Sequence, residues 1–328
     1  MRDWRFWLAE NRGTLVALAI FLVMFTIYVS NHPAGFTANV VNTAANKGVL
    51  LALVAMAQTM VVLTSGIDLS VGTIFVLCNC VASHLLLVSP LGTIFGLLVT
   101  LAVGALCGAI NGVLVIFGRL QPIVATIATG AVYYGLALWL RPDPGVADDF
   151  NGDFCDLFTG KLAFGVPASL VALTGVVLIV WAPFSRSALG RAAYAVGSSE
   201  LSAYMSGAPV KAAKFSVYVL AGLLAGIGGL YLTFLTQSGE ASSANASSYT
   251  LFSIASVVLG GVSLFGGSGS AIGAIFGALA FRAIGDLLFV FNIEPLWQPL
   301  FQGVVLLASV SIGAARLVGV RNRLELFG

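Results

Sequence analysis

The chain has 328 residues, of which 59% are hydrophobic and only 9% are charged, and its formal net charge is +2. A soluble domain carries roughly a quarter charged residues, because its surface must face water. This composition excludes an ordinary soluble protein and predicts an all-α integral membrane protein whose apolar exterior faces lipid.

The hydrophobic runs, taken in chain order, predict about ten transmembrane helices in one domain over residues 1–328, since ~20 mostly apolar residues cross a bilayer. The runs are 14–30, 48–64, 71–88, 91–118, 123–140, 164–184, 212–235, 250–264, 271–291 and 295–315. The first run follows a basic segment but no A-x-A-like cleavage site follows it, so we interpret it as a retained span rather than a secretion signal. A re-entrant run would reduce the number of spans to eight or nine.

The distribution of basic residues predicts the orientation, because Lys and Arg stay in the cytoplasm during membrane insertion. They gather in the N-terminal tail 1–13, the loop 185–211 and the C-terminal tail 316–328. With ten spans, these three segments lie on one side, so we expect both termini to be cytoplasmic. The acidic loop 141–163 then lies on the opposite, periplasmic side.

Two glycine triplets suggest an internal repeat. Gly104, Gly108 and Gly112 recur at a spacing of four, and so do the three glycines that lie 165 residues later, Gly269, Gly273 and Gly277. An offset of five spans would make spans 2–5 and 7–10 an inverted repeat, a common way to build a solute path at the bilayer midplane. Coincidence in a glycine-rich chain is the alternative. For the glycines themselves we expect helix packing, since small residues let helix backbones approach closely in lipid.

The stretch TSGIDLSVG, residues 64–72, breaks the helical pattern between two apolar runs. It places the carboxylate of Asp68 and the hydroxyl of Ser70 at membrane depth, where an ionisable group usually faces a cavity or a partner. The same residues could instead cap the start of the third span. The two interpretations are compatible, and both stay open.

Three stretches together resemble the ribose-type simple-sugar permeases of ATP-binding-cassette importers. Residues 64–72 are similar to that family's GIDLS signature, residues 258–270 (VLGGVSLFGGSGS) to its GG-x-S-L-x-GG element, and residues 190–207 to its cytoplasmic coupling loop. They occur in order over nearly the whole chain. The departures are Ala208-Pro209 after the coupling loop and Ser268 at a position where the family often has arginine.

The resemblance implies a type II importer-like permease in the bacterial inner membrane. Its partners would be a cytoplasmic ATPase subunit, a periplasmic sugar-binding protein and a second permease copy, identical or paralogous. It implies import of a monosaccharide or similar small polar solute by alternating access, with no cofactor. The resemblance does not identify the solute.

The loop 185–211 contains a short amphipathic piece, Glu200–Met205, that ends before Gly207. A helix here could contact a soluble ATPase and act as a lever on the neighbouring spans; the alternative is a solvated loop that only fixes the topology. The resemblance favours the lever, with Glu200, Ser206 and Gly207 at the ATPase contact.

Further polar residues lie within the predicted spans. Arg282 and Asp286 are four residues apart, so they share a helix face and can pair; they form either a gate or a neutralised pair near the outer interface. Asn111 lies among the glycines of the fourth span, where it could contact a sugar hydroxyl or a neighbouring helix. We place Asp68, Ser70 and Asn111 near the solute path.

Some function classes lack support in the sequence. No G-x-x-x-x-G-K-[ST] segment is present, and no catalytic or metal-binding pattern is present, so we expect a transport subunit rather than an enzyme, with ATP hydrolysed on another subunit. An ion-coupled secondary transporter, using Asp68 or Asp286, remains an alternative. So does a permease for branched-chain amino acids or nucleosides, against which GIDLS argues.

Overall fold

The structure is a computed structural model that describes residues 11–308 and 311, and in this part of the chain it contains helices and no β-strand longer than an isolated bridge. The predicted tail 316–328 and most of the tail 1–13 lie outside the described residues. The α-helices are α2 (Arg12–Asn31), α3 (Ala38–Val62), α4 (Val71–Leu85), α5 (Pro90–Ile116), α6 (Pro122–Leu140), α7 (Gly152–Thr159), α8 (Ala168–Val176), α9 (Ala182–Arg186), α10 (Ala188–Ser198), α11 (Glu200–Met205), α12 (Val210–Thr236), α13 (Ser243–Leu259) and α14 (Ala271–Val290).

Within the described residues, seven helical segments are long and apolar enough to cross a membrane. They are α2, α3, α5, α6, the continuous segment Ala168–Arg186 (α8, the π-helical turn Val177–Trp181 and α9), α12 and α14. The prediction of a multi-pass helical membrane protein is confirmed, and each of the seven overlaps a predicted run.

Two of the predicted runs are shorter helices than we expected. The run 71–88 forms α4, with 15 residues, and the run 250–264 is replaced by α13, which has 17 residues and begins at Ser243. At 1.5 Å per residue, 15 residues reach only about 22 Å, less than the ~30 Å hydrocarbon layer. The last run, 295–315, begins as a turn at Pro295–Trp297 and is helical over 298–308, and its remainder is largely outside the described residues.

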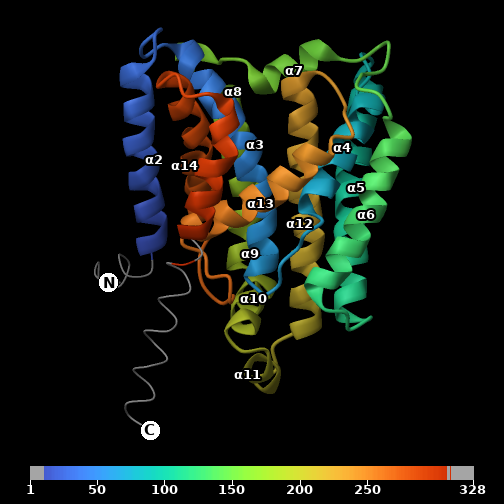
Figure 1. Cartoon of the computed structure of the whole chain (residues 1–328). Coiled ribbons are helices and arrows are strands. Elements are labelled where there is room, and N and C mark those ends of the chain that lie inside the picture. The colour runs from blue at the N-terminus through green and yellow to red at the C-terminus, as the bar shows by residue number, and fades with distance from the viewer. Residues whose placement is uncertain (1–10, 309–310, 312–328) are drawn as a thin grey trace.

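The arrangement in Figure 1 places α3, α4, α12 and α13 between α2 on one side and α5 and α6 on the other. Helix α3 is almost completely buried, whereas α2, α5 and α6 carry many exposed large apolar side chains. An apolar exterior around a packed interior is what lipid surroundings require. Helices α7 and α11 lie at opposite ends of the molecule, which we name the α7 end and the α11 end.

Glycine brings α5 and α12 into close contact. A Cβ atom on Gly104 would lie 2.6 Å from the carbonyl oxygen of Gly222, and one on Gly108 would overlap the backbone of Tyr218. Gly112 packs against Phe215 of the same helix α12. The two backbones therefore touch where only glycine fits.

The second triplet differs from the first. Gly273 and Gly277 lie on α14 and meet the backbone of α13 and its following turn, at Gly260 and Ser256. Gly269 lies outside the helix, because α14 begins only at Ala271; it has a φ of 115° and packs against Val262. The expected match of all three positions to the first triplet is wrong for this residue.

Each half of the chain places one long helix against two helices of the other half. Helix α12 contacts α4 and α5, which contact each other; α3 likewise contacts α13 and α14, which contact each other. Helix α3 begins at residue 38 and α12 at residue 210, while α4 begins at 71 and α13 at 243, so each of these two pairs is offset by 172 residues. The offset of 165 inferred from the glycines is therefore wrong as a register for these helices.

Candidate functional site

The turn between α3 and α4 holds a buried carboxylate. Asp68 is 0% exposed, and its Oδ1 accepts hydrogen bonds from the backbone N–H of Ser70 at 2.8 Å and from the Ser70 hydroxyl at 2.6 Å. The backbone bond satisfies an N–H group at the start of α4 that has no partner within the helix. Ser70 is the N-cap residue of α4, and its side chain makes no capping hydrogen bond to the helix. Asp68 instead accepts from the Ser70 N–H just before the helix begins.

The hydrogen bonds continue from this turn into α5 and α6. The Asn111 amide donates to the Ser70 hydroxyl at 2.7 Å and to Asp68 Oδ2 at 3.3 Å. Its carbonyl oxygen accepts from the hydroxyls of Thr129 at 2.7 Å and Tyr133 at 3.2 Å. We call these five residues the Asp68 cluster. It joins three elements that are far apart in the chain.

Two members of this cluster, Thr129 and Tyr133, were missed in the sequence. A signal was available: Thr126, Thr129 and Tyr133 share one face of an otherwise apolar helix at spacings of three and four. Thr126 also takes part, since its hydroxyl accepts from the Leu69 N–H at 3.0 Å. All members are buried, and their hydrogen bonds join the α3–α4 turn to α5 and α6.

A second site lies where three segments meet beside that turn. The Ser65 hydroxyl lies 2.6 Å from the carbonyl oxygen of Phe265 and 3.0 Å from that of Gly197, and the Gly267 N–H donates to the Leu63 carbonyl at 3.1 Å. We call this contact the three-segment junction. The three stretches that carry the family resemblance therefore contact one another.

Helices α10 and α11 form the part of the molecule that protrudes at the α11 end (Figure 1). Each is capped at its N-terminus by a serine hydroxyl, Ser187 for α10 and Ser199 for α11. Outside the spanning helices, α11 exposes three large apolar side chains, Leu201 (70%), Tyr204 (73%) and Met205 (79%). These side chains lie outside the seven helical segments that are long enough to cross a membrane.

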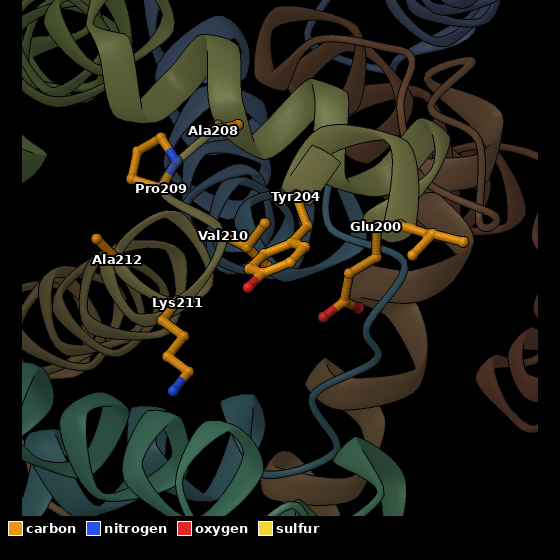
Figure 2. Close-up of a pocket in the computed structure, with 8 residues that line it drawn as sticks. Glu200, Tyr204, Ala208, Pro209, Val210, Lys211 and Ala212 are labelled. Carbon is orange, nitrogen blue, oxygen red and sulfur yellow. The ribbon is translucent and has the colours of Figure 1, made fainter. Parts of the chain in front are cut away.

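A hollow of about 800 Å³ separates α11 from the start of α12. Figure 2 shows Glu200, Tyr204 and Lys211 reaching into it. The Glu200 carboxylate forms an ion pair with Lys214 at 3.0 Å, so it also ties α11 to α12.

The remaining two residues expected at this contact follow α11 directly. The Ser206 hydroxyl donates back to the Ala203 carbonyl at 2.8 Å, and Gly207 has a φ of 78° with open space around it. Together they end the helix and redirect the chain toward α12.

The charged residues of α14 are arranged differently from the expectation. Asp286 forms its ion pair, at 4.0 Å, with Lys47 of α3, and no such pair joins it to Arg282. Tertiary packing therefore adds the charge of Lys47 to the two charges that share a face of α14. Among the described residues, no group of three or more His, Cys, Asp or Glu could hold a metal ion.

Comparisons with known proteins agree with the resemblance. Residues 40–310 match the family described as the permease component of the branched-chain amino acid transport system. The ribose import permease protein of Escherichia coli (strain K12) is 31% identical, covering 93% of this chain and 94% of its own length.

Two other relatives are similar over comparable lengths. The D-allose transport system permease protein of Escherichia coli (strain K12) is 30% identical, over 94% of this chain and 92% of its own. The autoinducer 2 import system permease protein of Enterobacter sp. (strain 638) is 32% identical, over 92% and 86%. No solved structure matches the chain. With a family match over most of its length, the chain belongs to the permease components of ATP-binding-cassette transporters, as its three motifs indicated.

Proposed function

We propose that this chain is the membrane-spanning subunit of an ATP-driven, binding-protein-dependent importer in the bacterial inner membrane. The observation that carries the proposal is the exposed apolar face of α11, which protrudes beyond the spanning helices. Helix α11 directly follows α10, and α10 takes part in the three-segment junction through Gly197. An ATPase subunit bound to α11 would act directly on the segments that enter α4 and α14. The α11 end is then cytoplasmic.

The α7 end is then periplasmic, and the acidic segment 141–163 is the surface that a solute-binding protein would contact. Segment 185–211 is the coupling loop, with Glu200, Ser206 and Gly207 near the ATPase. The exchanged contacts of α3–α4–α5 and α12–α13–α14 support an inverted repeat within a ten-span, type II importer-like permease. A second copy of this chain or a paralogue would complete the pathway.

The solute we propose is a monosaccharide or a similar small polar molecule, because the relatives are named for ribose, D-allose and autoinducer 2. The Asp68 cluster would fix the start of α4 beside the path during alternating access. The family description names branched-chain amino acids, so an amino acid or nucleoside permease is the nearest competing function.

The test is transport in liposomes that contain this chain and a co-expressed ATPase subunit, with ATP inside and [¹⁴C]ribose outside with a ribose-binding protein. ATP-dependent uptake of ribose over leucine and uridine supports the sugar importer, and preference for leucine or uridine supports the competing permease. Uptake by this chain alone that an ionophore abolishes would establish the ion-coupled alternative instead.

Co-purification of the ATPase subunit with variants of this chain tests whether α11 is the contact, separately from any loss of stability. We expect Tyr204→Glu to reduce ATPase co-purification at least tenfold, because it places a charge in the apolar face. Phe164→Glu is the matched control, since Phe164 is equally aromatic and fully exposed but lies in the segment between α7 and α8. Equal binding by both variants would show that α11 is not the contact.

A further inference from the structure

The three-segment junction depends on one side chain. The Ser65 hydroxyl has one proton but faces two carbonyl oxygens, of Phe265 at 2.6 Å and Gly197 at 3.0 Å. Phe265 belongs to the segment 260–270 between α13 and α14, and Gly197 belongs to the last turn of α10. A single hydroxyl therefore links the α3–α4 turn to two segments that are more than 130 residues away in the chain.

The backbone at this position favours glycine. Ser65 has a φ of 62°, in the left-handed region that residues with a Cβ atom rarely adopt. Glycine would take this conformation without steric cost, but it would lack the hydroxyl. Ser65 therefore combines a conformation that glycine adopts more readily with a hydroxyl that glycine lacks.

Ser65 itself is exposed, but the backbones beside its hydroxyl are in close contact with one another. A Cβ atom on Gly197 would overlap the Leu63 carbonyl and the Gly267 N–H, which are themselves hydrogen-bonded to each other at 3.1 Å. The hydroxyl of Tyr194, one turn earlier on α10, also bonds the carbonyl of Gly269 at 2.7 Å. Helix α10, the turn and the segment 260–270 thus pack as one unit.

Each of the three segments leads to a different helix. Helix α10 continues into α11, Ser65 is three residues from Asp68 at the start of α4, and Gly269 is two residues from the start of α14. We propose that Ser65 is a positioning residue whose hydroxyl clasps α10 and the segment 260–270 to the α3–α4 turn, so that displacement of α11 moves the starts of α4 and α14 together. This inference rests on the proposed function only for the source of that displacement.

The clasp itself is tested without any partner, by hydrogen–deuterium exchange of the whole chain in lipid nanodiscs. In Ser65→Ala we expect amides of 194–199 and 263–269 to exchange about fivefold faster, the effect of losing one hydrogen bond, while α5 and α6 keep their rates. Ser216→Ala is the matched control, because the Ser216 hydroxyl bonds only to Ala213 of its own helix. Unchanged exchange in Ser65→Ala would overturn the clasp.

A second variant separates the hydroxyl from the backbone. Ser65→Gly removes the strain as well as the hydroxyl, so the clasp predicts the same acceleration as Ser65→Ala. Wild-type exchange rates in Ser65→Gly would show that the conformation alone holds the junction, and would also overturn the proposal.

The role in coupling is measured as ribose molecules transported per ATP hydrolysed in the liposomes described above. We expect Ser65→Ala to hydrolyse ATP within about twofold of wild type but to transport about fivefold less ribose per ATP, and Ser216→Ala to keep the wild-type ratio. A wild-type ratio in Ser65→Ala overturns the positioning role. If the wild-type chain shows no ATP-dependent uptake, the proposed function fails, and the exchange measurements still decide whether the clasp exists.

Discussion

Replacing Asn111 by leucine tests the Asp68 cluster as a structural unit. The substitution keeps the approximate volume but removes four hydrogen bonds, to Asp68, Ser70, Thr129 and Tyr133. Hydrogen bonds between membrane helices average about 0.6 kcal/mol, so four of them give about 2 to 3 kcal/mol. Tyr133 keeps its bond to a backbone carbonyl of α5, which limits the loss.

The measurement is the free energy of unfolding in mixed detergent–SDS titrations, followed by tryptophan fluorescence. Asn31→Leu is the matched control: the Asn31 amide makes one exposed hydrogen bond within α2, so its removal should change the free energy by less than about 0.5 kcal/mol. If Asn111→Leu and Asn31→Leu unfold alike, the cluster does not stabilise the contact between α4, α5 and α6.

Three other predictions follow from the packing. Gly108→Leu should destabilise the protein by about 1 to 3 kcal/mol, the usual cost of overpacking, because the new side chain would meet the α12 backbone. Gly135→Leu is the control: this glycine is exposed and a Cβ atom there would meet nothing within 4 Å, so the free energy of unfolding should not change in the same titration. Burial raises the pKa of the Cys155 thiol to about 12, so the neutral thiol predominates and a maleimide at pH 8 should label it only after unfolding; rapid labelling of the folded protein would contradict this. Glu200→Gln should change the free energy of unfolding by less than about 1 kcal/mol, because its ion pair with Lys214 is at the surface; a larger loss would show that α11 depends on the pair.

The sequence was sufficient for the features that depend on local physics. Run length and hydropathy placed the long helices, because each must satisfy its own backbone hydrogen bonds in lipid. The stretches 64–72, 190–207 and 258–270 identified the family before any contact between them was known. The break in the helical pattern over residues 64–72 marked the end of α3 and the start of α4, because Gly, Asp and Ser favour turns over helix interiors.

Tertiary packing decided the rest. Hydropathy cannot distinguish a run that crosses the bilayer from one that stops early, so the short lengths of α4 and α13 were not predictable. The ion pair of Asp286 with Lys47 depends on the contact of α3 with α14, which brings in a charge that helix spacing cannot reveal. The meeting of Ser65 with Gly197 and Phe265 likewise depends on how helices from distant parts of the chain are rotated against one another, which residue periodicity within any one helix leaves undetermined.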